Sequence, residues 1–447
     1  MKGKGIPLCA SLLSAYCLAG CAEIEWRGGM TPSLNWKGIR GKDSFKEQGT
    51  AEANFREQTV SSPSWPDFRG PNRDGVAPEQ GMPLDWEQAP RRIWRQVAGQ
   101  GHSSVIVEAN RIYTAEQLGE QETLTCRSLK NGSLLWQHQE KQTWQDSMGG
   151  IGPRSTPVFS SGKIYFLSSA GKLICLDAVS GEVAWSRAVL ETDYEYPHWG
   201  LASTPLVSDG QVIVSTGGQT GAVKAYDSST GKPRWTSELQ GQGVYLSPSL
   251  LQLHGTNHLL AAVEGKLAGI DPSSGKTLWE HAWKIFMIKA QIAQPIAIDD
   301  DSFLLSAGYG KGAEVIRLIK NDDDFSTEQV WKSKNLKTKF SSPVLHEGHV
   351  YGFNESSLTC LNARTGELKW RGKKYGYGRI LLAKNKLLVL GNTGKLSVID
   401  ASPKAFKEIV SRQILVKERC WNGPALVGGY LVVRNGSEIS CYDWSKK

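Results

Sequence analysis

Residues 225–235 read AYDSSTGKPRW, and variants of this eleven-residue phrase recur along the chain. The other copies read CRSLKNGSLLW, CLDAVSGEVAW, GIDPSSGKTLW and CLNARTGELKW, and each has a glycine four residues before a tryptophan. The glycines are spaced 49, 50, 44 and 91 residues apart, and the last spacing is close to two periods: Gly132, Gly181, Gly231, Gly275 and Gly366. A period of about 40 to 50 residues predicts a closed or stacked array of small β units.

Residues 155–187 show the plan of one unit. The runs STPVFS, IYFLSS, LICLDA and VAWSR are separated by turns at Gly162, Gly171 and Gly181. Four short runs joined by three tight turns predict one four-stranded antiparallel blade. The tryptophan in the last run is expected to wedge against the next blade, so that Trp235→Ala costs roughly 3 to 5 kcal/mol. The predicted docking residues are Trp94, Trp136, Trp185, Trp235, Trp279, Trp331 and Trp370.

Eight such units can be counted. They start near Ser103, Ser155, Ser203, Ser247, Gln294, Ser341, Ile380 and Asn422. The fifth has the acidic insert 321–324 in place of the glycine turn, the seventh lacks the tryptophan, and the eighth is one strand short. Residues 92–97 form an orphan strand upstream, which is expected to complete the last blade and remove two exposed sheet edges. The predicted fold is all-β, an eight-bladed β-propeller of four-stranded antiparallel blades whose last blade is closed by an N-terminal strand.

The N-terminus is typical of an exported lipoprotein. Lys2 and Lys4 precede an apolar stretch, and Leu18-Ala19-Gly20-Cys21 resembles a bacterial lipobox. We therefore expect residues 1–20 to be a signal peptide, Cys21 to be lipidated, residues 21–64 to be a flexible tether and residues 65–447 to be the propeller. An ordinary secretory signal with an incidental cysteine is the alternative. Several acyl chains on one residue hold a protein durably on a bilayer.

Charge and cysteine usage exclude several classes of protein. The formal net charge is +8, of which two lysines lie in residues 1–20, and no basic run with interleaved aromatic residues marks a nucleic-acid surface. Residues 126, 175, 360 and 441 are cysteines at one equivalent repeat position, which is Ala225 or Gly269 in other copies and predicts a small buried packing site. Cys420 lies outside that position. Among the cysteines that follow Cys21, no pair has metal-ligand spacing.

The remaining polar clusters favour turns over metal sites. His254 and His258, like His346 and His349, are expected at exposed hairpin tips, without the helical spacing that a zinc motif needs. Residues 299–301 and 322–324 are acidic runs without EF-hand spacing, so solvated turns are the favoured interpretation and no metal site is predicted.

In five copies the repeats resemble the tryptophan-docking motifs of the pyrroloquinoline-quinone (PQQ) type eight-bladed propellers. The resemblance covers about residues 65–444, is clearest at residues 225–235, and extends to the segment WPDFRGPNRDG at residues 65–75. One branch of that family comprises quinoprotein dehydrogenases, which hold PQQ and Ca²⁺ on the propeller axis beside an aspartate base and two adjacent, disulfide-linked cysteines. The other branch is similar to the propeller lipoprotein of the outer-membrane β-barrel assembly machinery, a scaffold without a cofactor.

The segments before each innermost strand converge on the axis of a propeller. The predicted axial ring consists of His102, Arg154, Trp199, Tyr245, Gln294, Phe340, Arg379 and Trp421. Aromatic side chains with two arginines suit a planar anionic ligand, although the same residues also serve to fill and wall the channel. Soaking with PQQ is the test that separates the two interpretations.

The missing adjacent cysteines and the lipobox favour the scaffold branch. We expect a lipid-anchored, exported monomer on the periplasmic or cell-surface face of a bacterial membrane, with the outer membrane favoured. It would bind envelope proteins without catalysis or cofactor, in the assembly of the cell envelope or of outer-membrane proteins. A PQQ-dependent oxidoreductase with PQQ and Ca²⁺ is the alternative, and a sensor or recruitment module for a small molecule or polysaccharide is a third interpretation.

Overall fold

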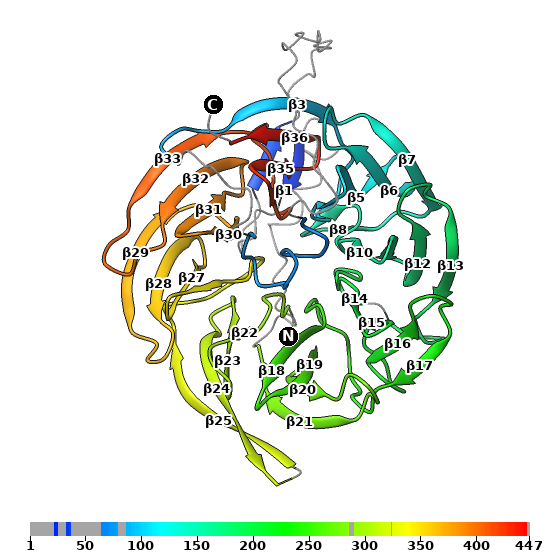
Figure 1. Ribbon diagram of the computed structural model, residues 1–447, viewed down its shortest axis with the longest axis vertical. Helices are drawn as coiled ribbons and strands as arrows, with labels where there is room; N and C mark the ends of the chain where they lie inside the picture. The colour runs from blue at the N-terminus through cyan, green and yellow to red at the C-terminus, as the bar shows by residue number, and fades with distance from the viewer. Residues whose placement is uncertain are drawn as a thin grey trace, which may run out of the picture.

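Eight antiparallel four-stranded sheets follow one another around a ring in the computed structural model (Figure 1). The structure describes residues 22–25, 33–36, 64–78, 86–195, 197–285, 290–322 and 324–444. The expected signal residues 1–20, Cys21 and most of the expected tether therefore lie outside the described residues. The described ranges contain no helix, and so none of the length and hydropathy needed to cross a bilayer.

Each blade runs from an innermost strand near the axis to an outermost strand at the rim. Blade 1 contains β4 (Ile106–Glu108), β5 (Arg111–Leu118), β6 (Gln121–Ser128) and β7 (Leu134–Lys141). Blade 2 contains β10 (Val158–Ser160), β11 (Lys163–Leu167), β12 (Lys172–Asp177) and β13 (Val183–Ala188). Blade 3 contains β14 (Leu206–Ser208), β15 (Gln211–Ser215), β16 (Val223–Asp227) and β17 (Pro233–Thr236). Blade 4 contains β18 (Ser249–Leu253), β19 (Thr256–Val263), β20 (Lys266–Ile270) and β21 (Thr277–Ala282).

The second half of the ring repeats this plan. Blade 5 contains β22 (Ile296–Ala297), β23 (Ser302–Ala307), β24 (Gly312–Asn321) and β25 (Asp324–Ser333). Blade 6 contains β26 (Val344–His346), β27 (His349–Asn354), β28 (Ser357–Asn362) and β29 (Leu368–Lys374). Blade 7 contains β30 (Arg379–Ala383), β31 (Lys386–Leu390), β32 (Lys395–Asp400) and β33 (Glu408–Gln413). Blade 8 contains β34 (Ala425–Val427), β35 (Tyr430–Arg434), β36 (Glu438–Asp443) and, as its rim strand, β3 (Arg91–Val97).

Two short ribbons complete the described strands. Strands β1 (Ala22–Glu25) and β2 (Ser33–Trp36) pair with each other inside the range expected to be a tether. Strands β8 (Gln145–Asp146) and β9 (Gly150–Ile151) pair between blades 1 and 2. The eight predicted units thus correspond to the eight blades, and the predicted fold class is confirmed.

The ring is closed by β3, as the sequence predicts. Strand β3 pairs antiparallel with β36, placing Trp94 opposite Cys441. The Trp94 indole N–H donates to the carbonyl of Leu129 in blade 1 at 2.8 Å. In Figure 1, β3 lies outside β36 at the rim, so chain segments from both ends of the propeller share one blade.

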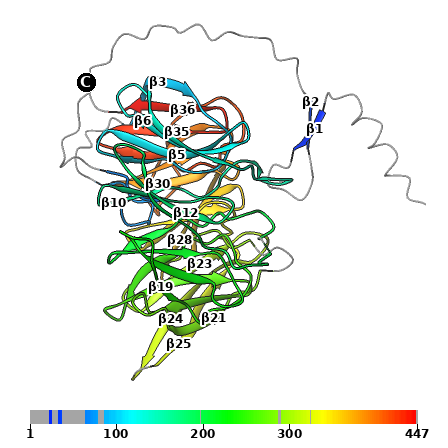
Figure 2. The ribbon, with the colours of Figure 1, turned by 90° about the vertical axis from the view of Figure 1, so that its right-hand side faces the viewer.

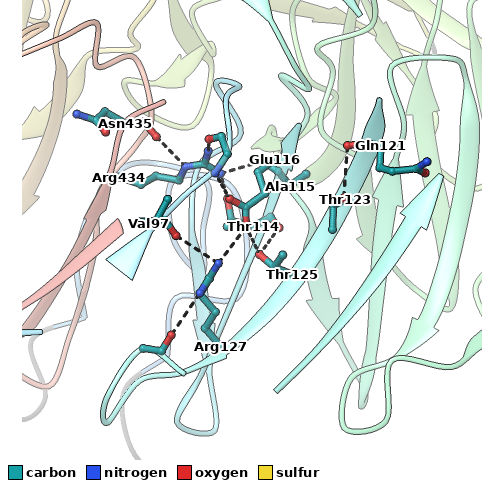
Figure 3. Close-up of polar contacts among 12 residues, drawn as sticks. Val97, Thr114, Ala115, Glu116, Gln121, Thr123, Thr125, Arg127, Arg434 and Asn435 are labelled. Atoms are coloured by element: carbon teal, nitrogen blue, oxygen red, sulfur yellow. Dashed lines mark hydrogen bonds and ion pairs between the residues drawn. The ribbon is translucent and has the colours of Figure 1, made fainter. Parts of the chain in front are cut away.

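A buried polar network reinforces this closure, and Figure 3 shows it. The Arg434 guanidinium on β35 is fully buried and donates to Thr114 Oγ1 and the Ala115 carbonyl, both at 2.8 Å, and to the Gly99 carbonyl at 2.7 Å. The buried Glu116 carboxylate accepts from Thr125 Oγ1 at 2.8 Å and faces Arg127 Nη2 at 3.5 Å. Because each charge has partners, the network joins blade 8 to blade 1 without leaving a lone buried ion.

The tryptophan wedges follow one geometry at five interfaces. Each indole lies flat against the turn glycine of the following blade, so closely that a Cβ on Gly231 would lie 2.6 Å from Trp185 Cε3. Its N–H donates to a backbone carbonyl in the same turn, as from Trp185 to Ser228 at 2.9 Å. The pairs are Trp94–Gly132, Trp136–Gly181, Trp185–Gly231, Trp235–Gly275 and Trp331–Gly366. The positive φ of these glycines and the close approach of the indole both exclude a side chain there.

The predicted small packing site is the cross-strand partner of the wedge. Cys126, Cys175 and Cys360 pair in register with Trp136, Trp185 and Trp370, and a β-bulge follows each pair. The sulfur atoms are buried and the five described cysteines are free thiols. In blade 7, which lacks the tryptophan, Val410 occupies the equivalent position opposite Val398.

The segment 64–78 crosses the centre of the ring in Figure 1, where it is drawn in blue. Trp65 exchanges backbone hydrogen bonds with Val107 of blade 1, at 2.8 and 2.9 Å, and the Pro66 carbonyl accepts from Phe159 of blade 2. Ala77 bonds to the Leu382 carbonyl of blade 7 at 2.8 Å. The segment therefore ties blades from both halves of the ring together, a role that its sequence did not predict. Figure 2 shows the ring from its side.

The expectation for His258 was wrong. This residue is fully buried, and its Nδ1 accepts from the Trp279 indole at 3.2 Å. The hairpin of β24 and β25 folds against blade 4, placing the Phe325 ring 4.9 Å from the His258 ring. The longer hairpin of blade 5 therefore covers His258, while residues 255–257 at the tip stay exposed.

Candidate axial binding site

The residues that precede the innermost strands surround a cavity on the propeller axis. The volume of this cavity is about 120 Å³. Seven residues of the predicted ring line it: His102, Arg154, Trp199, Tyr245, Phe340, Arg379 and Trp421. Gln294 does not line the cavity, because its side-chain amide hydrogen-bonds to the backbone of Ser247. Its backbone N–H donates to Ser342 Oγ at 2.9 Å. Gln294 therefore links neighbouring blades.

Aromatic rings form much of the wall. On the side of blades 3 and 4, the rings of Trp199 and Tyr245 are 5.4 Å apart. On the side of blades 6, 8 and 1, the Trp421 ring lies 4.4 Å from Phe340 and 5.0 Å from His102. Such surfaces suit a flat apolar ligand, because aromatic rings pack against one another in offset or tilted contacts.

The charged groups at the cavity are mostly cationic. Arg154 forms an ion pair with Asp146, and its Nη1 donates to the Gly152 carbonyl at 2.9 Å. Arg379 donates to the carbonyls of Trp421 and Phe340, and burial lowers its pKa to about 10, so it stays charged at neutral pH. The Arg419 guanidinium lies 4.7 Å from the centre of the Trp421 ring. Positive charge therefore exceeds negative charge around the aromatic walls.

His102 is neutral in this setting. Burial, followed by the charge of Arg154, lowers its pKa well below the usual range. Its Nε2 donates to the Gly149 carbonyl at 2.6 Å, which leaves Nδ1 as an acceptor. The imidazole of His102 thus presents an acceptor next to the cationic groups.

Several buried polar atoms at the cavity have no partner in the protein. They are the indole nitrogens of Trp199 and Trp421, the Tyr309 hydroxyl and His102 Nδ1. A buried polar group without a partner costs about 1 to 3 kcal/mol, so such atoms mark a place where a ligand or solvent completes the bonding.

Phe68 and Tyr309 also line the cavity and were missed by sequence reasoning. Phe68 belongs to the segment 64–78, which has no repeat period and therefore no predicted place in the ring. Tyr309 follows β23 in blade 5 and has a positive φ of 54°. Its only sequence signal is the GYGKG stretch, whose glycines gave no indication of an axial side chain.

The cavity does not fit PQQ held through Ca²⁺. No aspartate or glutamate lines it, and the described residues contain no group of three His, Cys, Asp or Glu side chains able to hold a metal. Calcium in proteins takes roughly six to eight oxygen ligands, with carboxylates prominent among them. The described cysteines are separate free thiols, so the adjacent pair implied by the dehydrogenase branch is also missing from this part of the chain.

The other clusters considered in the sequence stay outside this site. His346 and His349 pair with each other at the ends of β26 and β27. Asp299 bonds to Ser302 in a turn, and Asp301 forms an ion pair with Arg317 at 3.3 Å. These side chains serve local turns in the described structure.

Comparison with known proteins gives two groups of relatives. The chain is 21% identical to outer membrane protein assembly factor BamB of Yersinia pestis over 361 residues, 77% of this chain and 76% of that protein. It is 30% identical over 118 residues to the dehydrogenase subunit of alcohol dehydrogenase (quinone) from Gluconobacter oxydans, but this covers only 23% of the chain and 15% of that protein.

Solved structures show the same fold. A BamB structure from Moraxella catarrhalis superposes with a TM-score of 0.54 at 16% identity, covering 81% of this chain and 98% of that one. A europium-containing methanol dehydrogenase superposes with a TM-score of 0.62 at 11% identity, covering 85% and 98%. A family model described as outer membrane protein assembly factor BamB matches residues 137–372, more than half of the sequence. The chain therefore belongs to this PQQ-type propeller family, the family of outer membrane protein assembly factor BamB.

Proposed function

We propose that this protein is a non-catalytic scaffold of the bacterial envelope that binds components of the machinery assembling outer-membrane proteins. The observation that carries the proposal is the family match over residues 137–372, together with BamB relatives that align along most of the chain. The proposed anchor is a lipid on Cys21, with residues 1–20 as the export signal.

The rim of blades 8, 1 and 2 is the proposed docking surface for such a partner. Exposed apolar side chains occur on each of these three blades: Val97 (75% exposed), Leu134 and Leu135 (46% each), Val179 (66%) and Val183 (45%). Arg127 connects Val97 with Leu134. It pairs in register with Leu134, and its Nη2 lies 3.5 Å from the Val97 carbonyl. Exposed apolar side chains gathered among polar ones are typical of protein interaction sites.

The test is affinity purification of the full-length chain from the envelope of its own host in mild detergent. We compare the wild type with Leu134→Asp/Leu135→Asp and with a matched control, Ile319→Asp/Val330→Asp, whose residues are exposed on blade 5. The wild type and the control should retain outer-membrane assembly components, and the rim variant should lose them by about tenfold, since two charges placed in an apolar contact should together cost about 1.4 kcal/mol or more. All three proteins should melt alike, because surface changes rarely alter stability by more than about 0.5 kcal/mol.

Two results would reject the proposal. One is that assembly components are no more abundant with the wild type than with an unrelated lipoprotein of the same host. The other is that both variants retain them equally, which would remove the rim of blades 8, 1 and 2 as the docking surface. Replacing Cys21 with serine should release the protein from the membrane if the anchor is as proposed.

A quinoprotein oxidoreductase is the weaker alternative. The dehydrogenase relatives align over short stretches of their own length, and the axial cavity lacks the carboxylates that a calcium-bound quinone needs. The purified protein should therefore show no PQQ-dependent oxidation of alcohols.

A further inference from the structure

The axial cavity has a definite chemical character that the docking role does not use. Aromatic side chains from opposite sides of the propeller line the cavity, with Trp199 and Tyr245 on one side and Phe340 and Trp421 on the other. The walls therefore favour a flat, largely apolar ligand.

The polar atoms at the cavity specify the rest of that ligand. The indole N–H groups of Trp199 and Trp421 are buried and have no acceptor in the protein, and the Tyr309 hydroxyl has no partner. These groups are donors on residues that line the cavity, and a ligand that carries acceptor oxygens would satisfy them. His102 Nδ1, an acceptor without a partner, would receive a hydroxyl or N–H of the same ligand.

The charge balance points to an anion. Arg379 is half-buried and bonded only to backbone carbonyls, and no ion pair with a carboxylate forms there among the described residues. Arg154 is balanced by Asp146. A half-buried cation without a carboxylate partner favours a bound anion, because reduced exposure weakens solvent screening.

We propose that the axial cavity binds a small aromatic carboxylate that carries a hydroxyl or N–H group, and that it does so without a metal ion. The site differs from a quinone–calcium site because no carboxylate lines it. The carboxylate of the ligand would accept from the indole N–H groups of Trp199 and Trp421 and lie near Arg379. The aromatic ring of the ligand would lie against the aromatic walls of the cavity. This inference does not depend on the docking role.

The probe is 4-hydroxybenzoate, titrated into the full-length protein with tryptophan fluorescence and calorimetry, in the presence of EDTA. Its neutral isostere 4-hydroxybenzamide is the ligand control. Tyr309→Phe is the decisive variant, since it removes a hydroxyl that has no protein partner and so should leave the fold intact. Trp199→Phe removes one indole donor, while Gly162→Ala, in the turn between β10 and β11 and outside the cavity lining, is the control variant.

We expect saturable binding that EDTA does not change and that is at least about tenfold weaker for the amide. Tyr309→Phe and Trp199→Phe should each weaken binding by about tenfold, the effect of losing one hydrogen bond to a charged group, whereas Gly162→Ala should not. The proposal is overturned if the folded wild type shows no saturation at millimolar 4-hydroxybenzoate, if the amide binds equally well, or if binding requires Ca²⁺. Unchanged affinity in both cavity variants would place the ligand elsewhere.

Discussion

Blade 4 has a different kind of interface on each side. On the side of blade 3, the Trp235 indole lies against Gly275 and its N–H donates to the Pro272 carbonyl at 3.1 Å. On the side of blade 5, Trp279 has no turn glycine to meet. Its ring stacks on Phe303 at 5.5 Å and its N–H turns to His258 of its own blade.

The difference shows that the wedge has two parts, an indole and a receiving turn. Where blade 5 has the acidic hairpin 321–324 in place of the glycine turn, the extended β24–β25 hairpin covers blade 4 with Phe325 and joins it through His254 Nε2 and the Leu318 carbonyl at 2.7 Å. A similar replacement occurs at Trp370, which packs edge-on against Phe406 and donates to the Ser402 carbonyl at 2.7 Å. The tryptophan therefore keeps its place while its partner changes.

The largest expected effect is the loss of the indole on the regular side. Trp235→Ala should lower the free energy of unfolding by about 3 to 5 kcal/mol, because a large aromatic contact and a hydrogen bond to the next blade disappear together. Chemical denaturation of the wild type and the variant measures this difference in the free energy of unfolding. A loss below about 1 kcal/mol would show that the wedge contributes little to holding the blades together.

The next effect separates the wedge from backbone strain. Gly275 has φ of 79°, and a Cβ there would lie 2.6 Å from Trp235 Cε3; Gly162 has φ of 76° with nothing within 4 Å. Gly162→Ala should cost about 1 to 2 kcal/mol from the left-handed backbone alone. Gly275→Ala should cost roughly a further 1 to 3 kcal/mol for the overpacked indole, and equal losses in the two variants would contradict the contact.

On the irregular side, Phe325→Ala should cost about 2 kcal/mol, roughly half the value for a fully buried phenylalanine, because its ring is half-buried. The loss should be accompanied by faster amide exchange in β24 and β25 but not in β17. If the hairpin stays protected and stability is unchanged, Phe325 does not replace the glycine turn.

The smallest effect is the contribution of His258, on the irregular side, to the pH dependence of stability. Burial lowers the pKa of His258, and the charge of His254 lowers it further, so the folded state holds His258 neutral while the unfolded chain binds a proton below about pH 6.5. This contribution to stability is present above about pH 6.5 and is lost as the pH falls through the lowered folded-state pKa. Thermal melts from about pH 7.5 to 5 should fall less steeply for His258→Asn, which keeps an acceptor for Trp279. An identical slope would contradict the assignment.

The ring itself was readable in the sequence because its determinants are local and repeated. The glycine and tryptophan of each phrase, the turn residues and the orphan strand at 92–97 each act within a few residues of their position, so eight blades and their closure by β3 followed. Pro157 lies just before β10, the innermost strand of its blade. A proline there has no ladder bond to lose.

The features that were missed depend on contacts between distant segments. Segment 64–78 has no period, yet its backbone bonds to blades 1, 2 and 7. Arg434 and Glu116 are far apart in the sequence, and single charged residues in strands give no signal that they will meet at the ring closure. His258 was misjudged because the hairpin that covers it belongs to another blade. The axial residues were predicted from position alone, which also explains why Gln294 was included in the ring.

The most direct test of the account is the amount of folded outer-membrane β-barrel protein in the native host after deletion of this gene. Complementation with the wild-type chain and with Ile319→Asp/Val330→Asp should restore the wild-type amount, whereas Leu134→Asp/Leu135→Asp, expressed to the same level, should not. An unchanged amount of β-barrel protein in the deletion strain, or full restoration by the rim variant, would contradict the proposed scaffold role at that surface.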